Sequence, residues 1–210
     1  MLDHIIIQFA KLPILGKVKT RLSPDIGDQS CLELHRQLLQ YTHDNLKQVT
    51  DKLGGMSVLS IDQLGADSQI EAIAKTTPLL VQQGSDLGER MANTIRWGLR
   101  LAKKVIIVGS DCPVLTVEYY KQALNELNHE AHVFINAEDG GYVLVGATQA
   151  CDDLFENVPW GTDDVMAVTF ERLGAANKKA AILGPLWDVD RIDDLNRLKQ
   201  LKPNWPNEIT

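Results

Sequence analysis

Apolar and polar residues follow two different periods along the first 130 residues of the chain. Short uncharged runs predict buried strands, and apolar residues at three- and four-residue steps predict helices that cover them. The strands predicted in this part are His4–Phe9, Met56–Ile61, Leu79–Gln82 and Val105–Gly109, and the helices are Gln29–Val49, Ser68–Lys75, Asp86–Lys103 and Thr116–Leu127. Strict alternation of strands and helices indicates a parallel sheet with helices on both sides.

The pattern changes after residue 130. His132–Asn136 and Tyr142–Gly146 are two predicted strands only five residues apart, too close for a crossover helix, so we expect them to be antiparallel or joined by a tight irregular connection. The remaining predicted elements are a helix over Asp163–Leu173 with Thr162 as its N-cap, a strand over Ala180–Leu183 and a helix over Arg191–Leu201. The pattern predicts a three-layer α/β/α fold with a mostly parallel central sheet, in one domain over residues 1–210 with a loose tail from residue 203.

Composition and charge narrow the function classes. The chain has 210 residues, 44% of them hydrophobic, which suffices for one sizeable core. Its formal net charge of -7 argues against electrostatic binding to nucleic acid or to an anionic membrane surface. Any anion that the protein binds must therefore be held by a local cluster of basic side chains.

The cysteines and the first residues favour a cytoplasmic protein. Cys31, Cys112 and Cys151 are odd in number and far apart, so they form neither a disulfide framework nor a CxxC metal site. The apolar run in MLDHIIIQFA is too short for a signal peptide or a membrane span. The sequence leaves the oligomeric state open.

The predicted central strand ends in a carboxylate. Val105–Gly109 is followed at once by Ser110, Asp111, Cys112 and Pro113. A side chain just past the carboxyl end of a central strand lies where open α/β sheets bind their ligands. The alternative is that Asp111 only caps the turn, since aspartate is common at turns and helix starts.

A basic loop follows the first strand. Lys11, Lys17, Lys19 and Arg21 all fall within Ala10–Leu22 of this acidic chain, together with Gly16. A glycine that lets the backbone approach closely and four cations suit a polyphosphate. The loop lacks the Gly-Lys-Ser/Thr of a Walker A motif and does not match GxGxxG. The alternative is a solvated basic loop.

Aspartates at three further places in the chain each allow a structural and a functional interpretation. Asp139-Gly140-Gly141 suits a hairpin turn, and Asp86 suits either a helix cap or a substrate contact. Asp190 can cap the last helix, with Asp193 in a capping-box arrangement. Alternatively, Asp188 or Asp190 joins Asp111 as a second carboxylate on a divalent cation, since Mg²⁺ prefers one or two carboxylates plus phosphate oxygens.

Six motifs in order resemble one known family. They are FAKLPILGKVKTRL, QQGSDLGERM, VGSDCPVL, AEDGGYVLVG, LFENVPWGT and DVDRIDDL, spread from Phe9 to Leu195. Together they resemble the DUF2064 ("transferase 1" type) proteins of bacteria, which have a glycosyltransferase-A fold and no assigned substrate. That family is similar to the nucleotide-diphospho-sugar transferases, which include molybdenum-cofactor nucleotidyltransferases and 2-phospholactate guanylyltransferase.

The resemblance implies a nucleotide site with a divalent cation. The loop Lys11–Arg21, with Gly16, would bind the nucleotide phosphates, and Lys19 and Arg21 would stabilise charge that develops on them. Asp111 and Asp190 would hold Mg²⁺ or Mn²⁺.

The resemblance also implies roles on the two sides of the phosphates. Gln82 or Gln83 would lie near the base or sugar, and we take Gln83 as the nucleotide contact. Asp139, Gly140, Gly141 and Tyr142 would line the acceptor side. If the reaction is glycosyl transfer, Asp139 is the candidate base that activates a hydroxyl group. If it is nucleotidyl transfer, we expect an acceptor that already carries a phosphate or carboxylate, and no base is required.

Several positions depart from the family's wider pattern and keep the reaction open. Arg191 and Ile192 replace the Thr-Pro of a DTPEDL-like motif, Asn136 replaces a proline, and a single aspartate replaces Asp-X-Asp. The prediction is therefore a metal-dependent transferase that moves a glycosyl or nucleotidyl group from a nucleotide to a small acceptor. The alternative is a non-catalytic nucleotide-binding or regulatory protein with the same fold.

Overall fold

The computed structural model describes residues 1–202 and 204–205 and contains one seven-stranded sheet. In chain order the strands are β1 (Leu2–Ala10), β2 (Met56–Ile61), β3 (Leu79–Val81), β4 (Ala102–Val108), β5 (His132–Ala137), β6 (Tyr142–Ala147) and β7 (Ala180–Leu186). Their order across the sheet is β3-β2-β1-β4-β6-β5-β7. The helices are α1 (Ser23–Leu53), α2 (Ser68–Ala74), α3 (Leu87–Leu99), α4 (Val117–Glu126), α5 (Asp152–Phe155), α6 (Val165–Ala175) and α7 (Ile192–Leu201).

One antiparallel strand interrupts the otherwise parallel sheet. β1 pairs in parallel with β2 and β4, and β5 pairs in parallel with β7. β6 runs antiparallel to both of its neighbours, β4 and β5, as the short link between the two predicted strands requires. The mostly parallel α/β/α fold is confirmed.

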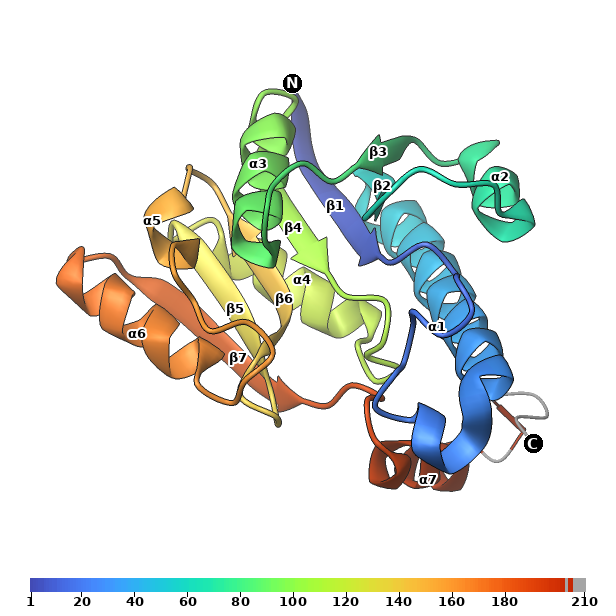
Figure 1. The fold of residues 1–210 in the computed structure, drawn as a ribbon. Coiled ribbons are helices and arrows are strands. Elements are labelled where there is room, and N and C mark those ends of the chain that lie inside the picture. The colour runs from blue at the N-terminus through green and yellow to red at the C-terminus, as the bar shows by residue number, and fades with distance from the viewer. Residues whose placement is uncertain (203, 206–210) are drawn as a thin grey trace.

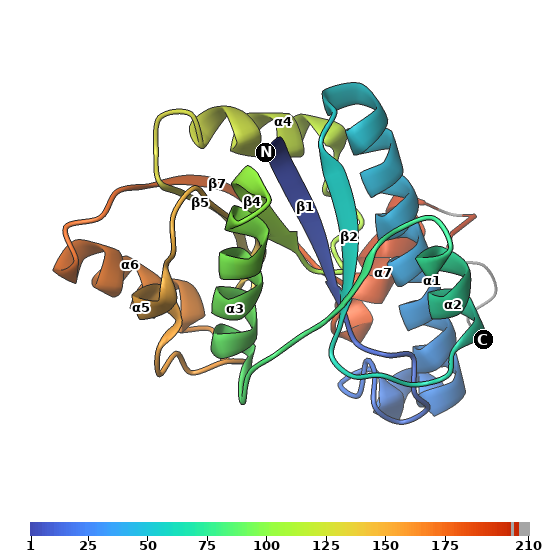
Figure 2. The same ribbon diagram turned by 90° about the horizontal axis from the view of Figure 1, so that it is seen from above.

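Helices cover both faces of the sheet (Figure 1). Seen from above, α3, α5 and α6 lie on one side, while α1 and α4 lie on the other (Figure 2). The fully buried strand residues Ile5, Ile7 and Val105 pack toward the first group, and Ile6 and Ile106 pack toward the second. This two-sided burial explains why the first and fourth strands show continuous apolar runs.

The last helix closes one end of the molecule. α7 packs against the start of α1 through a small apolar cluster that contains Leu22, Leu34, Trp187 and Leu195. This contact places the segment before α7 beside the loop that follows β1, two parts of the chain about 170 residues apart. The site described below depends on that contact.

Several predicted boundaries were wrong. The helix predicted over Asp86–Lys103 ends at Leu99, and β4 begins at Ala102, because a tight turn without glycine or proline joins them. α1 begins at Ser23 and continues past the non-helical Gly27 (φ 79°), whereas the sequence predicted a start at Gln29. The one-turn helix α5 carried no periodic signal and was missed.

Leu87, the first residue of α3, is 43% exposed because it lies at the rim of a cleft. The loose tail was predicted over 203–210, and residues 203 and 206–210 lie outside those that the structure describes. Within the described ranges, no helix has the length and apolarity needed to cross a membrane.

Asp67 joins α2 to α1. Its carboxylate accepts hydrogen bonds from the backbone N–H of Gln69 (3.0 Å) and Ile70 (3.1 Å) and pairs with Arg36 of α1. The side chain is only 5% exposed, and burial raises the pKa of its carboxyl; the Arg36 guanidinium and the two N–H groups outweigh burial and lower it. Asp67 therefore stabilises the fold above pH 4, and the contribution is lost as the pH falls below the ordinary aspartate pKa.

We expect Asp67→Ala to lower the free energy of unfolding at pH 7 by about 2–3 kcal/mol, because it removes a helix cap and leaves Arg36 unpaired. Urea unfolding monitored by circular dichroism measures the change. Asp51→Ala, at an exposed site near the end of α1, is the control and should change stability by no more than about 0.5 kcal/mol. Equal losses in the two variants would contradict the role of Asp67.

Candidate functional site

A cleft of about 570 Å³ opens at the carboxyl ends of β1 and β4. Three separate stretches of sequence meet in it: the loop after β1, the turn after β4 and the segment before α7. The charged and polar side chains among its lining residues are Lys11, Lys19, Thr20, Arg21, His35, Asp62, Gln82, Arg90, Ser110, Asp111, Trp160 and Asp190. The structure therefore brings the basic loop and the predicted acidic residues Asp111 and Asp190 together.

Lys19 and Asp111 form an ion pair at the floor of the cleft. Lys19 Nζ donates to Asp111 Oδ2 at 2.9 Å, and the two side chains are 6% and 37% exposed. Burial disfavours both charges, but the attraction between them outweighs it, so the pKa of Lys19 is raised and that of Asp111 is lowered. Both groups are charged at neutral pH.

The surroundings of Asp111 favour a ligand site over a helix cap. The N-cap of α4 is Thr116, five residues further on, so Asp111 caps no helix. A Cβ at Gly109 would lie 2.9 Å from Asp111 Oδ1, so the glycine leaves room for the carboxylate. The neighbouring Ser110 is held by Gln8 (3.1 Å) and donates to the carbonyl of Phe9 (2.8 Å), which fixes the end of β4 against β1.

Arg21 pairs with the second predicted metal ligand. Its guanidinium donates to Asp190 Oδ2 at 2.6 Å and to the carbonyl of Gly161 at 3.0 Å. The expected capping box of Asp190 with Asp193 was wrong. Asp194 accepts from the backbone N–H of Asp190 (3.0 Å) and of Arg191 (2.7 Å), because α7 begins one residue later, at Ile192.

Asp188 lies beside Asp111. The backbone N–H of Val189 donates to the carbonyl of Asp111 at 2.9 Å, which holds the Asp188–Asp190 segment against the turn after β4. Burial, followed by the charges of Asp111 and Asp139, raises the pKa of the Asp188 carboxyl to about 7. Sequence reasoning considered Asp188 only as an alternative to Asp190, because nothing in the sequence tells which of the two faces Asp111.

The donor set at this point suits a hard cation. Among the described residues, no three His, Cys, Asp or Glu side chains are arranged to hold a metal ion by themselves. Mg²⁺ needs fewer, since it takes one or two carboxylates and completes its shell with phosphate oxygens and water. Asp111 with either Asp188 or Asp190 can supply that pair. Asp111 and Asp190 are paired with Lys19 and Arg21, respectively. Asp188 has no ion-pair partner among the described residues, and burial and the charge of Asp111 raise its pKa.

A smaller cavity of about 200 Å³ adjoins the cleft and reaches the β5–β6 turn. The hairpin interpretation of that turn holds, since Asp139 Oδ1 accepts from the N–H of Gly141 (3.0 Å) and Gly140 has φ 89°. Asp139, Gly141 and Tyr142 line this cavity. The hydroxyl group of Tyr142 is bonded to Thr169 Oγ1 (2.5 Å), and burial raises its pKa to about 12.

Some predicted residues lie away from these two cavities. Gly16 and Gln83 are exposed and are not among the lining residues, and Gly140 is absent from the lining of the smaller cavity. Gln82, the other glutamine considered, does line the cleft, and its amide nitrogen donates to the Ser60 carbonyl at 3.0 Å. Trp160 lines both cavities; sequence reasoning assigned it no site role, although it stands in the motif LFENVPWGT.

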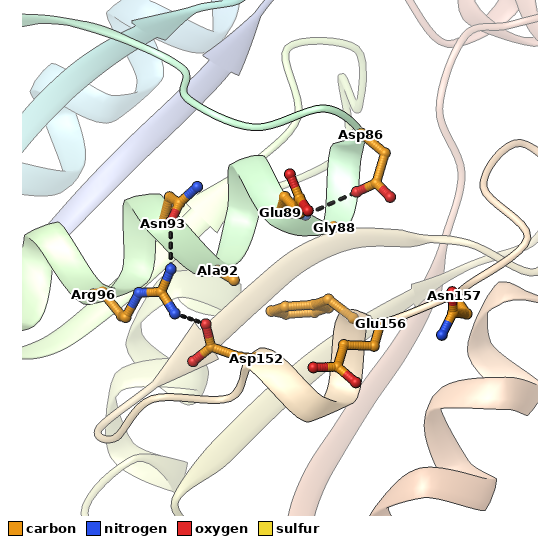
Figure 3. Close-up of a pocket in the computed structure, with 10 residues that line it drawn as sticks. Asp86, Gly88, Glu89, Ala92, Asn93, Arg96, Asp152, Glu156 and Asn157 are labelled. Carbon is orange, nitrogen blue, oxygen red and sulfur yellow. Dashed lines mark hydrogen bonds and ion pairs between the residues drawn. The ribbon is translucent and has the colours of Figure 1, made fainter.

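Another cavity of about 570 Å³ lies between α3 and α5 (Figure 3). Several of its polar groups are engaged with one another: Asp86 accepts from the N–H of Glu89 (2.9 Å), and Arg96 contacts both Asn93 and Asp152. Asp86 is thus the N-cap of α3, as one of its two interpretations predicted. The cavity contains none of the predicted phosphate-binding residues.

The raised pKa of Asp188 predicts a pH-dependent stability. A carboxyl whose pKa is higher in the folded state than in the unfolded state stabilises the fold while it is protonated. That contribution is lost as the pH rises through the pKa of the folded state, here about 7. In EDTA, we expect Asp188→Asn to raise the free energy of unfolding at pH 8 by about 2 kcal/mol, which allows for solvent screening at a half-buried site. The gain should shrink toward pH 4. Urea unfolding from pH 4 to 8 measures it.

Asp193→Asn, at an exposed position five residues away, is the control for this measurement and should leave the pH profile unchanged. A gain for Asp188→Asn that is the same at pH 4 and pH 8 would show that the crowding of carboxylates is not its cause.

Comparison with known proteins agrees with the geometry. Residues 39–162 match the DUF2064 family model, which describes uncharacterized proteins conserved in bacteria. The crystal structure of a candidate nucleotide-diphospho-sugar transferase from Desulfovibrio desulfuricans G20 is 32% identical in sequence. It superposes with a TM-score of 0.85 over 98% of this chain and 90% of that one.

Two other relatives are more distant. A 2-phospho-L-lactate guanylyltransferase from Methanobrevibacter smithii is 27% identical over 126 residues, which are 59% of this chain and 53% of that enzyme, so the match spans about half of the relative. A protein from Mycobacterium tuberculosis H37Rv, crystallised with manganese, shares the fold with 15% identity. Its TM-score is 0.55, over 95% of this chain and 99% of that one.

Proposed function

This chain belongs to the DUF2064 family of bacterial proteins, and we propose that it is a divalent-metal-dependent nucleotidyltransferase that takes a nucleoside triphosphate as its donor. The observation that carries the proposal is the Lys19–Asp111 pair, 2.9 Å long, at the floor of a cleft lined by four further basic residues. Those residues are Lys11, Arg21, His35 and Arg90. The guanylyltransferase relative and the nucleotide-diphospho-sugar transferase neighbour support a nucleotide as the ligand.

The cationic side chains would bind the triphosphate. Lys11 follows β1 and Arg90 lies in α3, and both line the cleft. Because they come from different elements, they can contact different phosphates. Lys19 is charged, and its ammonium group is held by Asp111. Phosphate oxygens would offer Lys19 a second partner, and hydrogen bonds between charged groups are the strong ones.

Asp111 and Asp188 would hold Mg²⁺ or Mn²⁺, which would neutralise charge on the phosphates and orient them for attack at the α-phosphorus. This chain's residues do the remaining work. Arg21 lies where it can balance charge that develops on the leaving pyrophosphate, and its pairing with Asp190 and Gly161 fixes its direction. His35, whose pKa is lowered by burial, stays neutral and bonds the Lys11 carbonyl (2.9 Å), which shapes the loop.

A thermal-shift panel tests the proposal. The four nucleoside triphosphates and the common UDP-, GDP-, CDP- and dTDP-sugars are compared with and without Mg²⁺. A ligand at about 100 times its Kd adds about 2.7 kcal/mol of stability, a rise in Tm of about 5–10 °C for a chain of this size. We expect a Mg²⁺-dependent rise with one triphosphate. A rise only with a nucleotide sugar would favour glycosyl transfer, and no rise with any of them would contradict the proposal.

A further inference from the structure

The cavity of about 200 Å³ beside the cleft has the position of an acceptor site. It shares five lining residues with the cleft: Phe9, Leu87, Gly109, Trp160 and Gly161. A molecule in the cavity therefore lies next to the phosphates that the proposed function places in the cleft. The rest of the lining is mainly apolar, from Met91, Ile107, Tyr142, Val143, Leu144, Val145 and Val165.

The lining of this cavity carries acidic groups but no basic ones. Among the described residues, its charged lining residues are Asp139 and Asp188, and no lysine, arginine or histidine lines it. The same two aspartates also line an adjoining cavity of about 510 Å³. That cavity carries six carboxylates against two guanidinium groups: Glu138, Asp139, Asp163, Asp188, Asp190 and Asp194 against Arg21 and Arg191.

The guanidinium groups nearby lie outside the smaller cavity. Arg21 is engaged by Asp190 at 2.6 Å, and Arg191 lines only the adjoining cavity, among its six acidic residues. Asp188 would share its charge with the bound cation, but Asp139 remains, and the described lining offers no lysine, arginine or histidine to a phosphate or carboxylate on the acceptor. Ionised carboxylates only accept hydrogen bonds, so they select groups that donate them.

An aromatic wall completes the cavity. Trp160 is held edge-on to Tyr142 (ring centroids 6.2 Å apart) and close to Phe155 (6.4 Å). A Cβ at Gly88 would lie 2.9 Å from the Trp160 ring, so only glycine there lets the indole pack on α3. The indole N–H has no hydrogen-bond partner among the described residues, so ring packing orients the side chain, while the backbone N–H of Trp160 donates to the Val158 carbonyl at 2.8 Å. Such a ring offers an apolar surface to the C–H groups of a small cyclic ligand.

From these features we infer that the acceptor is a small hydroxyl-bearing molecule without an anionic group, of the sugar or polyol class, bound between Trp160 and Asp139. The inference rests on the proposed function. It separates this chain from the relative whose name specifies a phosphorylated lactate as acceptor.

The proposed transfer forms one bond to phosphorus and breaks one. The acceptor oxygen forms a bond to the α-phosphorus, the bond from that phosphorus to the α–β bridging oxygen breaks, and pyrophosphate leaves with the bond's electron pair. The hydroxyl proton passes to the carboxylate of Asp139, whose Oδ1 is held by the N–H of Gly141 and whose Oδ2 has no partner among the described residues. No oxidant or further reactant is needed.

Fractionation tests the inference without knowledge of the acceptor. A bacterial small-molecule extract is passed over an anion-exchange resin, and each fraction is incubated with the protein, Mg²⁺ and the α-³²P-labelled triphosphate that binds best. We expect labelled product from the unretained fraction, which holds neutral and cationic compounds. Product only from the retained, anionic fraction would overturn the inference, and so would metal-dependent nucleotide binding without product from either fraction. Loss of nucleotide binding itself would count against the proposed function instead.

Two variants sharpen the result. With the active fraction, Trp160→Ala should raise the acceptor KM about tenfold and raise the Kd of the Mg²⁺-nucleotide by less, since Trp160 lines both cavities. Nucleotide binding that persists in the variant also shows that it folds. Asp139→Asn should lower kcat at least 100-fold, as loss of a general base does. Phe170→Ala, an exposed aromatic residue on α6, is the control and should change neither value. Unchanged acceptor KM in Trp160→Ala would contradict the placement.

Discussion

Lys19→Met should weaken binding of the Mg²⁺-nucleotide about 10–100-fold. The ammonium group is the buried cation nearest to the carboxylates of the cleft, and a hydrogen bond to a charged partner contributes about 1.5–3 kcal/mol. Methionine keeps the unbranched shape of the side chain and removes only the charge. Isothermal titration calorimetry with the triphosphate identified by the thermal-shift panel measures the change.

The same variant should be less stable without metal, because Asp111 loses its cation and repels Asp188. We expect a loss of about 2 kcal/mol at pH 7.5 in EDTA, less than for a fully buried pair because Asp111 is partly exposed. The added substitution Asp111→Asn should restore most of it. Lys17→Met, two residues away and exposed, is the control for both effects. If both lysine variants behave alike, the loop acts only as a diffuse basic surface.

Asp111→Asn should abolish the dependence of nucleotide binding on Mg²⁺. Asparagine occupies the same volume but cannot replace an ionised carboxylate as a ligand to a hard cation. We expect the Kd in Mg²⁺ to rise at least 30-fold, to the value that the unmodified protein shows in EDTA. Calorimetry in both buffers measures this. Asp62→Asn, another aspartate in the cleft lining, is the matched control. A normal Mg²⁺ effect in Asp111→Asn would remove the assignment of the metal to this carboxylate.

The general fold could be predicted from the sequence because burial on both faces leaves a strong signal. Strands such as Met56–Ile61 are short uncharged runs, and the structure gives that strand the predicted bounds. The turn between β5 and β6 was predictable from Asp-Gly-Gly and from the short spacing. Boundaries failed where a turn lacked glycine or proline, as between α3 and β4.

The site could be predicted only where its residues follow strand ends. Asp111 and the loop that holds Lys19 come directly after β4 and β1, so topology alone places them at one edge of the sheet. The position of Asp188 beside Asp111 depends on one hydrogen bond from Val189 to Asp111, which no local pattern indicates. The place of Trp160 in the cleft lining could not be predicted from its motif, because it lies in an irregular stretch and packs with α5 against Gly88.

Electron paramagnetic resonance of Mn²⁺ tests the central claim most directly. Free Mn²⁺ is measured while the protein is titrated in the presence and absence of the nucleotide selected by the thermal-shift panel. The proposed site predicts about one bound Mn²⁺ per chain when the nucleotide is present, much weaker binding without it, and loss of the bound ion in Asp111→Asn. Mn²⁺ binding that is unaffected by the nucleotide, or that is as tight in Asp111→Asn as in the unmodified protein, would contradict it.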